Sequence, residues 1–209
     1  MHNTGILTVF SGFSGSGKGT VMKRLLEKYP DQYALSVSCT SRKPRTGEQD
    51  GREYFFKSRE EFEQLIADGQ FLEYARYVDH YYGTPAGYVQ QQLDAGKDVI
   101  LEIELQGAMQ IRAKRSDAML IFLTPPSAAE LERRLRGRGT ETDEVIRARL
   151  RRAAQEAEGM TQYDYLIVND DLEACVEQVH RLIQSQHTRM ENRKAFAEQI
   201  SREVRRFAE

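Results

Sequence analysis

The feature that most constrains this chain is a glycine- and serine-rich run ending in a lysine and a threonine, Gly12-Phe13-Ser14-Gly15-Ser16-Gly17-Lys18-Gly19-Thr20. An apolar, β-rich segment precedes it at residues 6–10, and a helix-compatible segment follows at residues 21–28. Glycines at a strand-to-helix turn let backbone N–H groups converge on an anion, and the helix N-terminus adds positive potential. Lys18 would supply a cation for nucleotide phosphates, and Thr20 a hydroxyl for Mg²⁺. The run predicts a phosphate-binding loop, with a ligand-free turn as the alternative.

Composition narrows the class of protein. The 209 residues are 40% hydrophobic and 30% charged, which is typical of one soluble globular domain. The net charge of −2 gives no reason to expect a nucleic-acid or membrane partner. Cys39 and Cys175 lie far apart without metal-ligand spacing, which favours a reducing compartment. No run approaches the roughly 18 apolar residues of a membrane span, and the first residues are too polar for a signal peptide. We therefore expect a cytoplasmic protein.

Short apolar runs predict the strands of a buried parallel sheet, at residues 6–10, 99–103, 119–123 and 165–168. Helical stretches separate most of them, which favours an α/β fold with helices on both faces of the sheet. Ligands bind such sheets at the carboxyl ends of the strands. Glu104, at that end of the second run, could hold Mg²⁺ through water or pair with Lys18. The alternative is that Glu102 and Glu104 are surface residues of an edge strand.

The segment between the first two runs, residues 36–88, has a different character. It begins with serines and arginines, continues with a predicted strand at residues 51–56, and then shows a capping box. In that box Ser58 and Glu61 predict a helix running to about Asp68. Six of the ten tyrosines fall here: Tyr54, Tyr74, Tyr77, Tyr81, Tyr82 and Tyr88. Tyrosines among arginines and serines suit a pocket for a polar small molecule, although they could also cover a lobe with little core.

Residues 133–152 contain only three acidic residues but eight arginines. The arginines are Arg133, Arg134, Arg136, Arg138, Arg147, Arg149, Arg151 and Arg152. Gly137 and Gly139 divide the segment into two helical arms. The guanidinium group suits phosphate oxygens, so the pattern predicts a lid that closes over a transferring phosphoryl group. The alternative, for at least half of these arginines, is a solvated helix face.

Two more helix starts and a tail complete the chain. Ser127 and Glu130 form a second predicted capping box. Asp170 or Asp171 should cap the last core helix, which spans residues 172–186, and Asn169 could bond a nucleobase. In the charged tail, apolar residues recur with helical spacing at Phe196, Ile200 and Val204. A tail helix could therefore pack on the body or on a second subunit.

Taken together, these motifs resemble the guanylate kinases, nucleoside monophosphate kinases of the P-loop fold, from about residue 5 to residue 181. The resemblance rests on residues 11–20, 38–48, 51–56, 81–84, 102–107 and 137–141. It implies an α/β three-layer fold with a parallel sheet, an inserted mixed lobe that binds the nucleoside monophosphate, and a helical lid. The expected division is a core of residues 1–35, 90–133 and 160–184, a GMP-binding lobe of residues 36–89, a lid of residues 134–159 and a helical tail of residues 185–209.

The resemblance also implies the reaction, transfer of the γ-phosphoryl group of ATP to GMP with Mg²⁺, and a role for each matching residue. ATP would be bound by Gly12, Phe13, Ser14, Gly15, Ser16, Gly17, Lys18, Gly19, Thr20 and Asn169, with Thr20 toward Mg²⁺, partly through water. The GMP phosphate would be held by Arg42, Arg45, Tyr54 and Tyr82, and the guanine by Ser38, Glu73, Thr84 and Glu104. The lid arginines on the transferring group would be Arg134, Arg138 and Arg149, with Arg134 and Asn169 beside adenine. Lys18, Arg42 and the lid arginines would be catalytic.

The resemblance has two departures and leaves alternatives open. Gly19 follows the lysine, so the hydroxyl comes one residue later at Thr20, and Glu104 stands where the family often has aspartate. A catalytically silent binding module of the same fold should lack Lys18 or the lid arginines. A kinase for a ribose phosphate would not need Ser38, Glu73 and Thr84 together, and a GTPase would leave the lid and the second pocket unexplained. A homo-oligomer formed through the C-terminal helix is a further expectation.

Overall fold

A computed structural model of the chain describes residues 4–137 and 142–208. A parallel sheet of five strands lies at its centre, in the spatial order β2 (Tyr33–Leu35), β7 (Asp98–Glu102), β1 (Leu7–Gly12), β8 (Met119–Thr124) and β9 (Tyr165–Val168). The four predicted strands are confirmed, with ends that differ by at most two residues. Strand β2 was not predicted, because three residues are too few to show a periodic pattern.

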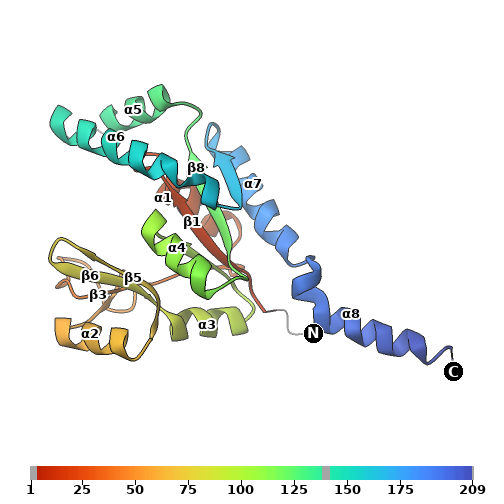
Figure 1. Cartoon of the computed structure of the whole chain (residues 1–209). Helices are drawn as coiled ribbons and strands as arrows, with labels where there is room; N and C mark the ends of the chain where they lie inside the picture. Colours follow the sequence, from red (N-terminus) through yellow and green to blue (C-terminus); the bar gives the residue numbers. More distant parts are fainter. Residues whose placement is uncertain (1–3, 138–141, 209) are drawn as a thin grey trace.

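Helices cover both faces of this sheet and make three layers (Figure 1). Helices α1 (Lys18–Lys28) and α7 (Leu172–Gln186) pack on the face that presents Phe10. Helices α3 (Ala86–Asp94) and α4 (Leu105–Lys114) pack on the other face, which presents Val9. Successive side chains of a strand point to opposite faces, so the continuous apolar run of β1 supplies both cores.

A second, mixed sheet forms a lobe beside the first, with the strands β4 (Phe55–Phe56), β3 (Cys39–Thr40), β6 (His80–Pro85) and β5 (Phe71–Tyr77) in spatial order. Helix α2 (Arg59–Ala67) covers it, and the capping box predicted at Ser58 and Glu61 is confirmed. The strand predicted at residues 51–56 is correct only at β4. Gly51 has a φ of 78°, a left-handed conformation that belongs to a turn.

The segment predicted as the lid, residues 134–159, contains the end of α5 (Ala128–Arg136) and all of α6 (Asp143–Glu158), and the short helix η1 (Met160–Gln162) follows it. Leu131, Leu135 and Ile146 pack these helices against Phe13 of the loop. The capping box predicted at Ser127 is only half formed. The Ser127 hydroxyl accepts a hydrogen bond from the Glu130 backbone, but the Glu130 carboxylate bonds to arginines one turn further along α5. A charged partner within reach outcompetes the backbone N–H.

Helix α8 (Met190–Arg205) follows α7 and projects away from the body (Figure 1). Asp171, one of the two predicted residues, caps α7 by accepting a hydrogen bond from the Ala174 backbone. In α8 the predicted apolar positions Phe196, Ile200 and Val204 are exposed. Among residues 4–137 and 142–208, no helix combines the length and the apolar character that crossing a membrane requires.

Candidate active site

The glycine-rich loop turns between β1 and α1, as its sequence predicted. Gly15 and Gly17 have φ values of 95° and 96°, which non-glycine residues rarely adopt. The Lys18 ammonium group donates to the carbonyls of Gly12, at 2.7 Å, and Phe13, at 3.1 Å. Lys18 is therefore folded back along the loop, with its positive charge held against the loop carbonyls.

Two residues from distant parts of the chain hold the loop in place. The side-chain amide of Asn169, which follows β9, donates to the Ser16 carbonyl at 2.8 Å. Arg134 of α5 donates to the same carbonyl at 3.3 Å and to the Asn169 carbonyl at 2.8 Å. A Cβ atom at Gly17 would lie 2.4 Å from the Asn169 amide nitrogen, so this close approach also requires glycine. The expected pair Asn169 and Arg134 is thus brought together, against the outside of the loop.

The other loop residues differ in what they offer a ligand. The Phe13 side chain is buried edge-on against Phe122, with ring centroids 5.0 Å apart, so only its backbone is available. The Ser16 side chain is also buried. Ser14 accepts a hydrogen bond of 2.7 Å from Arg149 of α6, which links the lid to the loop. Thr20 is exposed on the first turn of α1.

A cavity of about 870 Å³ joins the loop, the lobe and the lid. Lys18 lines it from the loop, Thr84 and Tyr54 from the lobe, and Arg149 from the lid. In Figure 1 the lobe and the lid helices lie on opposite sides of α4. The volume lies within the usual range for small-molecule sites.

The carboxylates at the end of β7 require a correction. The strand ends at Glu102 rather than at residue 103, and Glu102 is the carboxylate that interacts electrostatically with Lys18. Surrounding protein atoms raise the pKa of Glu102, and the charge of Lys18 opposes that rise. Glu104 instead is the N-cap residue that precedes α4, and its carboxylate pairs with Arg152 of α6. The sequence run carried both glutamates, but only the strand register decides which one reaches the loop.

The lobe holds a buried carboxylate behind Thr84, a residue of the cavity wall. Glu73 and Thr84 are partners on β5 and β6, and the Thr84 hydroxyl donates to the Glu73 carboxylate at 2.6 Å. Glu73 is only 6% exposed. Burial raises the pKa of Glu73, and the Thr84 hydrogen bond opposes the rise. A Cβ atom at Gly107 would lie 2.8 Å from a Glu73 oxygen, so glycine makes room for the carboxylate.

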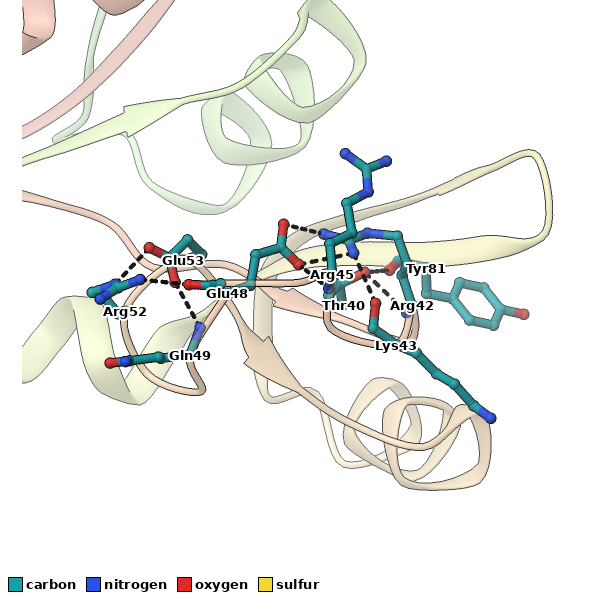
Figure 2. Close-up of polar contacts among 10 residues, drawn as sticks. Thr40, Arg42, Lys43, Arg45, Glu48, Gln49, Arg52, Glu53 and Tyr81 are labelled. Atoms are coloured by element: carbon teal, nitrogen blue, oxygen red, sulfur yellow. Dashed lines mark hydrogen bonds and ion pairs between the residues drawn. The ribbon is translucent and has the colours of Figure 1, made fainter.

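Figure 2 shows three arginines of the lobe, Arg42, Arg45 and Arg52. The Arg42 guanidinium makes two hydrogen bonds of 2.9 Å to Glu48 and lies 5.5 Å from the centre of the Tyr54 ring. The Tyr82 ring packs against Tyr54 at 5.9 Å. The Arg45 guanidinium projects from the loop, without a side-chain partner among the described residues (Figure 2). Sequence reasoning missed the role of Glu48, which orients Arg42 and also accepts from the Arg45 backbone.

Some tyrosines of the lobe line the cavity, and others cover the small core of the lobe. Tyr54 and Tyr77 line the cavity, as a ligand role would require. Tyr81 stacks on Phe62 with ring centroids 5.3 Å apart, and Tyr88 packs against Phe55, so these two cover the small core of the lobe.

Two serines between β2 and β3 supply a further part of the cavity wall. Ser38, the predicted guanine ligand, lines the cavity. Ser36 also lines it, and the Ser36 hydroxyl is buried without a partner among the described residues. Sequence reasoning missed Ser36, because a serine following a three-residue strand carries no recognisable signal.

The lid arginines do not act alike. Arg134 and Arg149 contact the loop, and Arg152 contacts Glu104. Arg133 and Arg136 pair with acidic neighbours on the lid itself. Arg147 and Arg151 are exposed, and Arg138 lies outside the described residues. A solvated helix face is therefore the correct description for several of the eight.

Comparisons with known proteins agree with this arrangement. The sequence model of a family described as guanylate kinase matches residues 5–186. A guanylate kinase of Streptococcus thermophilus is 54% identical over 191 residues, covering 91% of each chain. One from Lactococcus lactis is 51% identical, covering 91% of this chain and 93% of that relative.

The structural comparison supports the same assignment. A crystal structure of guanylate kinase from Anaplasma phagocytophilum is 33% identical, with a TM-score of 0.68, and the match covers 90% of this chain and 88% of that one. A glycine-rich loop, a mixed lobe and an arginine-bearing lid thus line one cavity in a chain of matching sequence. This chain belongs to the guanylate kinase family.

Proposed function

We propose that the chain transfers the γ-phosphoryl group of ATP to GMP, giving ADP and GDP. One observation carries the proposal: the same cavity is lined by Lys18 of the glycine-rich loop and by Thr84, whose hydroxyl donates to the buried Glu73 carboxylate. The loop suits the phosphates of a donor nucleotide. The carboxylate suits a base that presents N–H donors.

Guanine is the base that fits Glu73. It presents N1–H and the 2-amino group side by side, and an ionised carboxylate can accept from both. Adenine presents an unprotonated N1 at the same edge and cannot satisfy a buried anion. Leaving a buried charged group unpaired is costly, so Glu73 should discriminate strongly between the two bases. Thr84, Ser38 and Glu104 complete the proposed guanine site.

The phosphate of GMP would bind between Arg42, Arg45, Tyr54 and Tyr82. Arg42 is already oriented by Glu48. Among the described residues no side chain pairs with the Arg45 guanidinium, so it can bind a phosphate without first losing such a contact. Because the two arginines supply two positive charges, they can neutralise a doubly charged phosphate. The phenol hydroxyls of the tyrosines would add hydrogen bonds.

The reaction needs no general base in this proposal. A phosphate oxygen of GMP is already ionised at neutral pH, so catalysis consists of positioning and charge stabilisation. Lys18 and the loop backbone hold the donor phosphates. Arg134, Arg138 and Arg149 stabilise the transferring group, and the Arg149 bond to Ser14 places one of these charges at the loop.

Mg²⁺ fits the oxygen ligands at the loop. Thr20 offers a hydroxyl on the first turn of α1, and Glu102 offers a carboxylate at the end of β7 near the charge of Lys18. Both are hard oxygen donors of the kind Mg²⁺ prefers, directly or through water. The ion would neutralise charge on the β- and γ-phosphates.

The test is to measure ADP formation from Mg·ATP with GMP, AMP, CMP and UMP in parallel. A strong response to GMP alone is the expected result, and chromatography should show GDP in equal amount to ADP. A folded protein that responds to none of the four would overturn the proposal and favour a binding module or a sugar-phosphate acceptor. ADP without GDP would indicate hydrolysis instead.

We also propose that two copies of the chain associate through α8. The apolar residues Phe196, Ile200 and Val204 recur every fourth residue along a helix that projects from the body, and each is exposed. A second copy offers the same stripe, so pairing would bury both. Light scattering should give twice the chain mass for the wild type and a monomer for Phe196→Asp, and a monomeric wild type would refute this.

The cytoplasm is the proposed location. Cys39 and Cys175 are both free and buried, which fits the reducing conditions there. Burial raises the pKa of each thiol to about 11, so neither is readily oxidised.

A further inference from the structure

Helix α6 presents one continuous face to the cavity. Val145, Ala148, Arg149, Arg152 and Glu156 all line it, and each lies three or four residues from another member of the set. This spacing places side chains on the same side of a helix. Two arginines on this face, less than one turn apart, therefore look toward the same space.

The two arginines contact different substrate sites. Arg149 donates to Ser14 in the loop, on the side proposed for ATP. Arg152 donates to an oxygen of Glu104, at the start of α4, on the side proposed for guanine. Because both belong to one helix, a lid position that brings Arg149 to the loop also brings Arg152 to Glu104.

A second carboxylate, that of Glu156, also bonds to Arg152. The Arg152 Nε atom donates to Glu156 at 3.1 Å, and the Glu156 side chain is only 17% exposed. Glu104, in contrast, is 68% exposed and makes no capping hydrogen bond to its own helix. Among the described residues, Arg152 alone donates a hydrogen bond to the Glu104 side chain, and it does so to Oε2. The second oxygen, Oε1, remains available to a ligand in the cavity.

We propose that Arg152 is a positioning residue for the acceptor nucleotide: it fixes the Glu104 carboxylate so that Oε1 can accept a hydrogen bond from guanine. This inference rests on the proposed function. An exposed glutamate samples many rotamers, and fixing one of them before binding reduces the entropy lost when the ligand arrives. The lid thereby completes the acceptor site as well as the donor site.

The expected effect is modest because the pair is partly exposed. Ion pairs of this kind correspond to about a two- to fivefold change in an equilibrium constant. Arg152→Ala should raise KM for GMP by about that factor, while kcat and KM for ATP change by less than twofold. Arg152→Lys should recover part of the loss, since an ammonium group can still donate to Glu104.

The decisive experiment is a double-mutant cycle. Kinetics and calorimetric GMP binding are measured for the wild type, Arg152→Ala, Glu104→Ala and the double variant. If Arg152 acts through Glu104, the double variant binds GMP no more weakly than Glu104→Ala alone. Additive losses, or an unchanged KM for GMP in Arg152→Ala, would overturn the proposal.

A matched control separates this contact from general charge. Arg151 is the neighbouring, exposed lid arginine, and Arg151→Ala removes the same charge. An equal rise in KM for GMP in that variant would also overturn the proposal. Calorimetry separates the positioning role of Arg152 from the proposed reaction. If the wild type forms no GDP, the proposed reaction fails. Weaker GMP binding by Arg152→Ala would still support the positioning role.

Discussion

Replacing Glu73 with glutamine tests the proposed base recognition with the smallest change in shape. Glutamine has the same number of heavy atoms, and its carbonyl oxygen can still accept the hydrogen bond from Thr84. Its amide nitrogen, however, only donates. One of the two N–H donors of guanine then faces another donor instead of an acceptor.

The magnitude follows from the bond that is lost. A hydrogen bond to a charged group contributes about 1.5 to 3 kcal/mol, and Glu73→Gln removes one such bond to guanine. This corresponds to a fall in kcat/KM for GMP of about 10- to 150-fold. The loss should be mainly in KM. The ratio of kcat/KM for AMP to kcat/KM for GMP should rise, because the new amide can donate to the adenine N1.

The assay compares kcat/KM for GMP and AMP in the wild type, Glu73→Gln and a control, Glu60→Gln. Glu60 is an exposed glutamate on α2, so its replacement should leave both values within twofold. If kcat/KM for GMP in Glu73→Gln stayed within twofold of wild type, or the GMP-to-AMP ratio did not change, the role assigned to Glu73 would be refuted.

Stability should change in the opposite direction to activity. Burial raises the pKa of Glu73 in the folded protein, so the folded state holds this proton more tightly than the unfolded state does. The ionised carboxylate therefore costs stability, and that cost is present above the folded-state pKa and disappears below the unfolded value. At neutral pH, Glu73→Gln should unfold at the same or a higher temperature than wild type. As the pH falls toward 4.5, the unfolding temperature of the wild type should rise relative to that of the variant.

Three further variants test other parts of the site. Lys18→Ala should lower kcat on the order of 100- to 1,000-fold, as expected when one charge-stabilising group is removed, and a steady-state assay showing a kcat near wild type would contradict this. Gly107→Ala places a Cβ atom 2.8 Å from the Glu73 carboxylate, so KM for GMP should rise while KM for ATP stays constant; equal changes in both would contradict the geometry. Arg42→Ala should raise KM for GMP and also destabilise the fold, because Glu48 loses both hydrogen bonds from the guanidinium. Chemical denaturation measures the second effect, and an unchanged midpoint would contradict it.

Much of this protein is predictable from residues that are close in sequence. The phosphate loop is one contiguous run, and its strand, glycines, lysine and helix all lie within residues 6–28. The cap of α2 joins Ser58 and Glu61, three residues apart, and forms as predicted. Local interactions of this kind depend on the backbone of one segment only, so the sequence alone determines them.

Tertiary structure alone decided the contacts that bring distant segments together. Asn169 reaches the loop carbonyl of Ser16 across 153 positions of sequence, and Glu73 becomes a buried carboxylate only because β5 and β6 pair with Thr84 at its side. Glu102 and Glu104 are alike in sequence, yet the sheet register and the start of α4 give one to Lys18 and the other to Arg152. Burial, and hence the pKa of a carboxylate, depends on which elements pack around it, and a single sequence does not contain that information in local form.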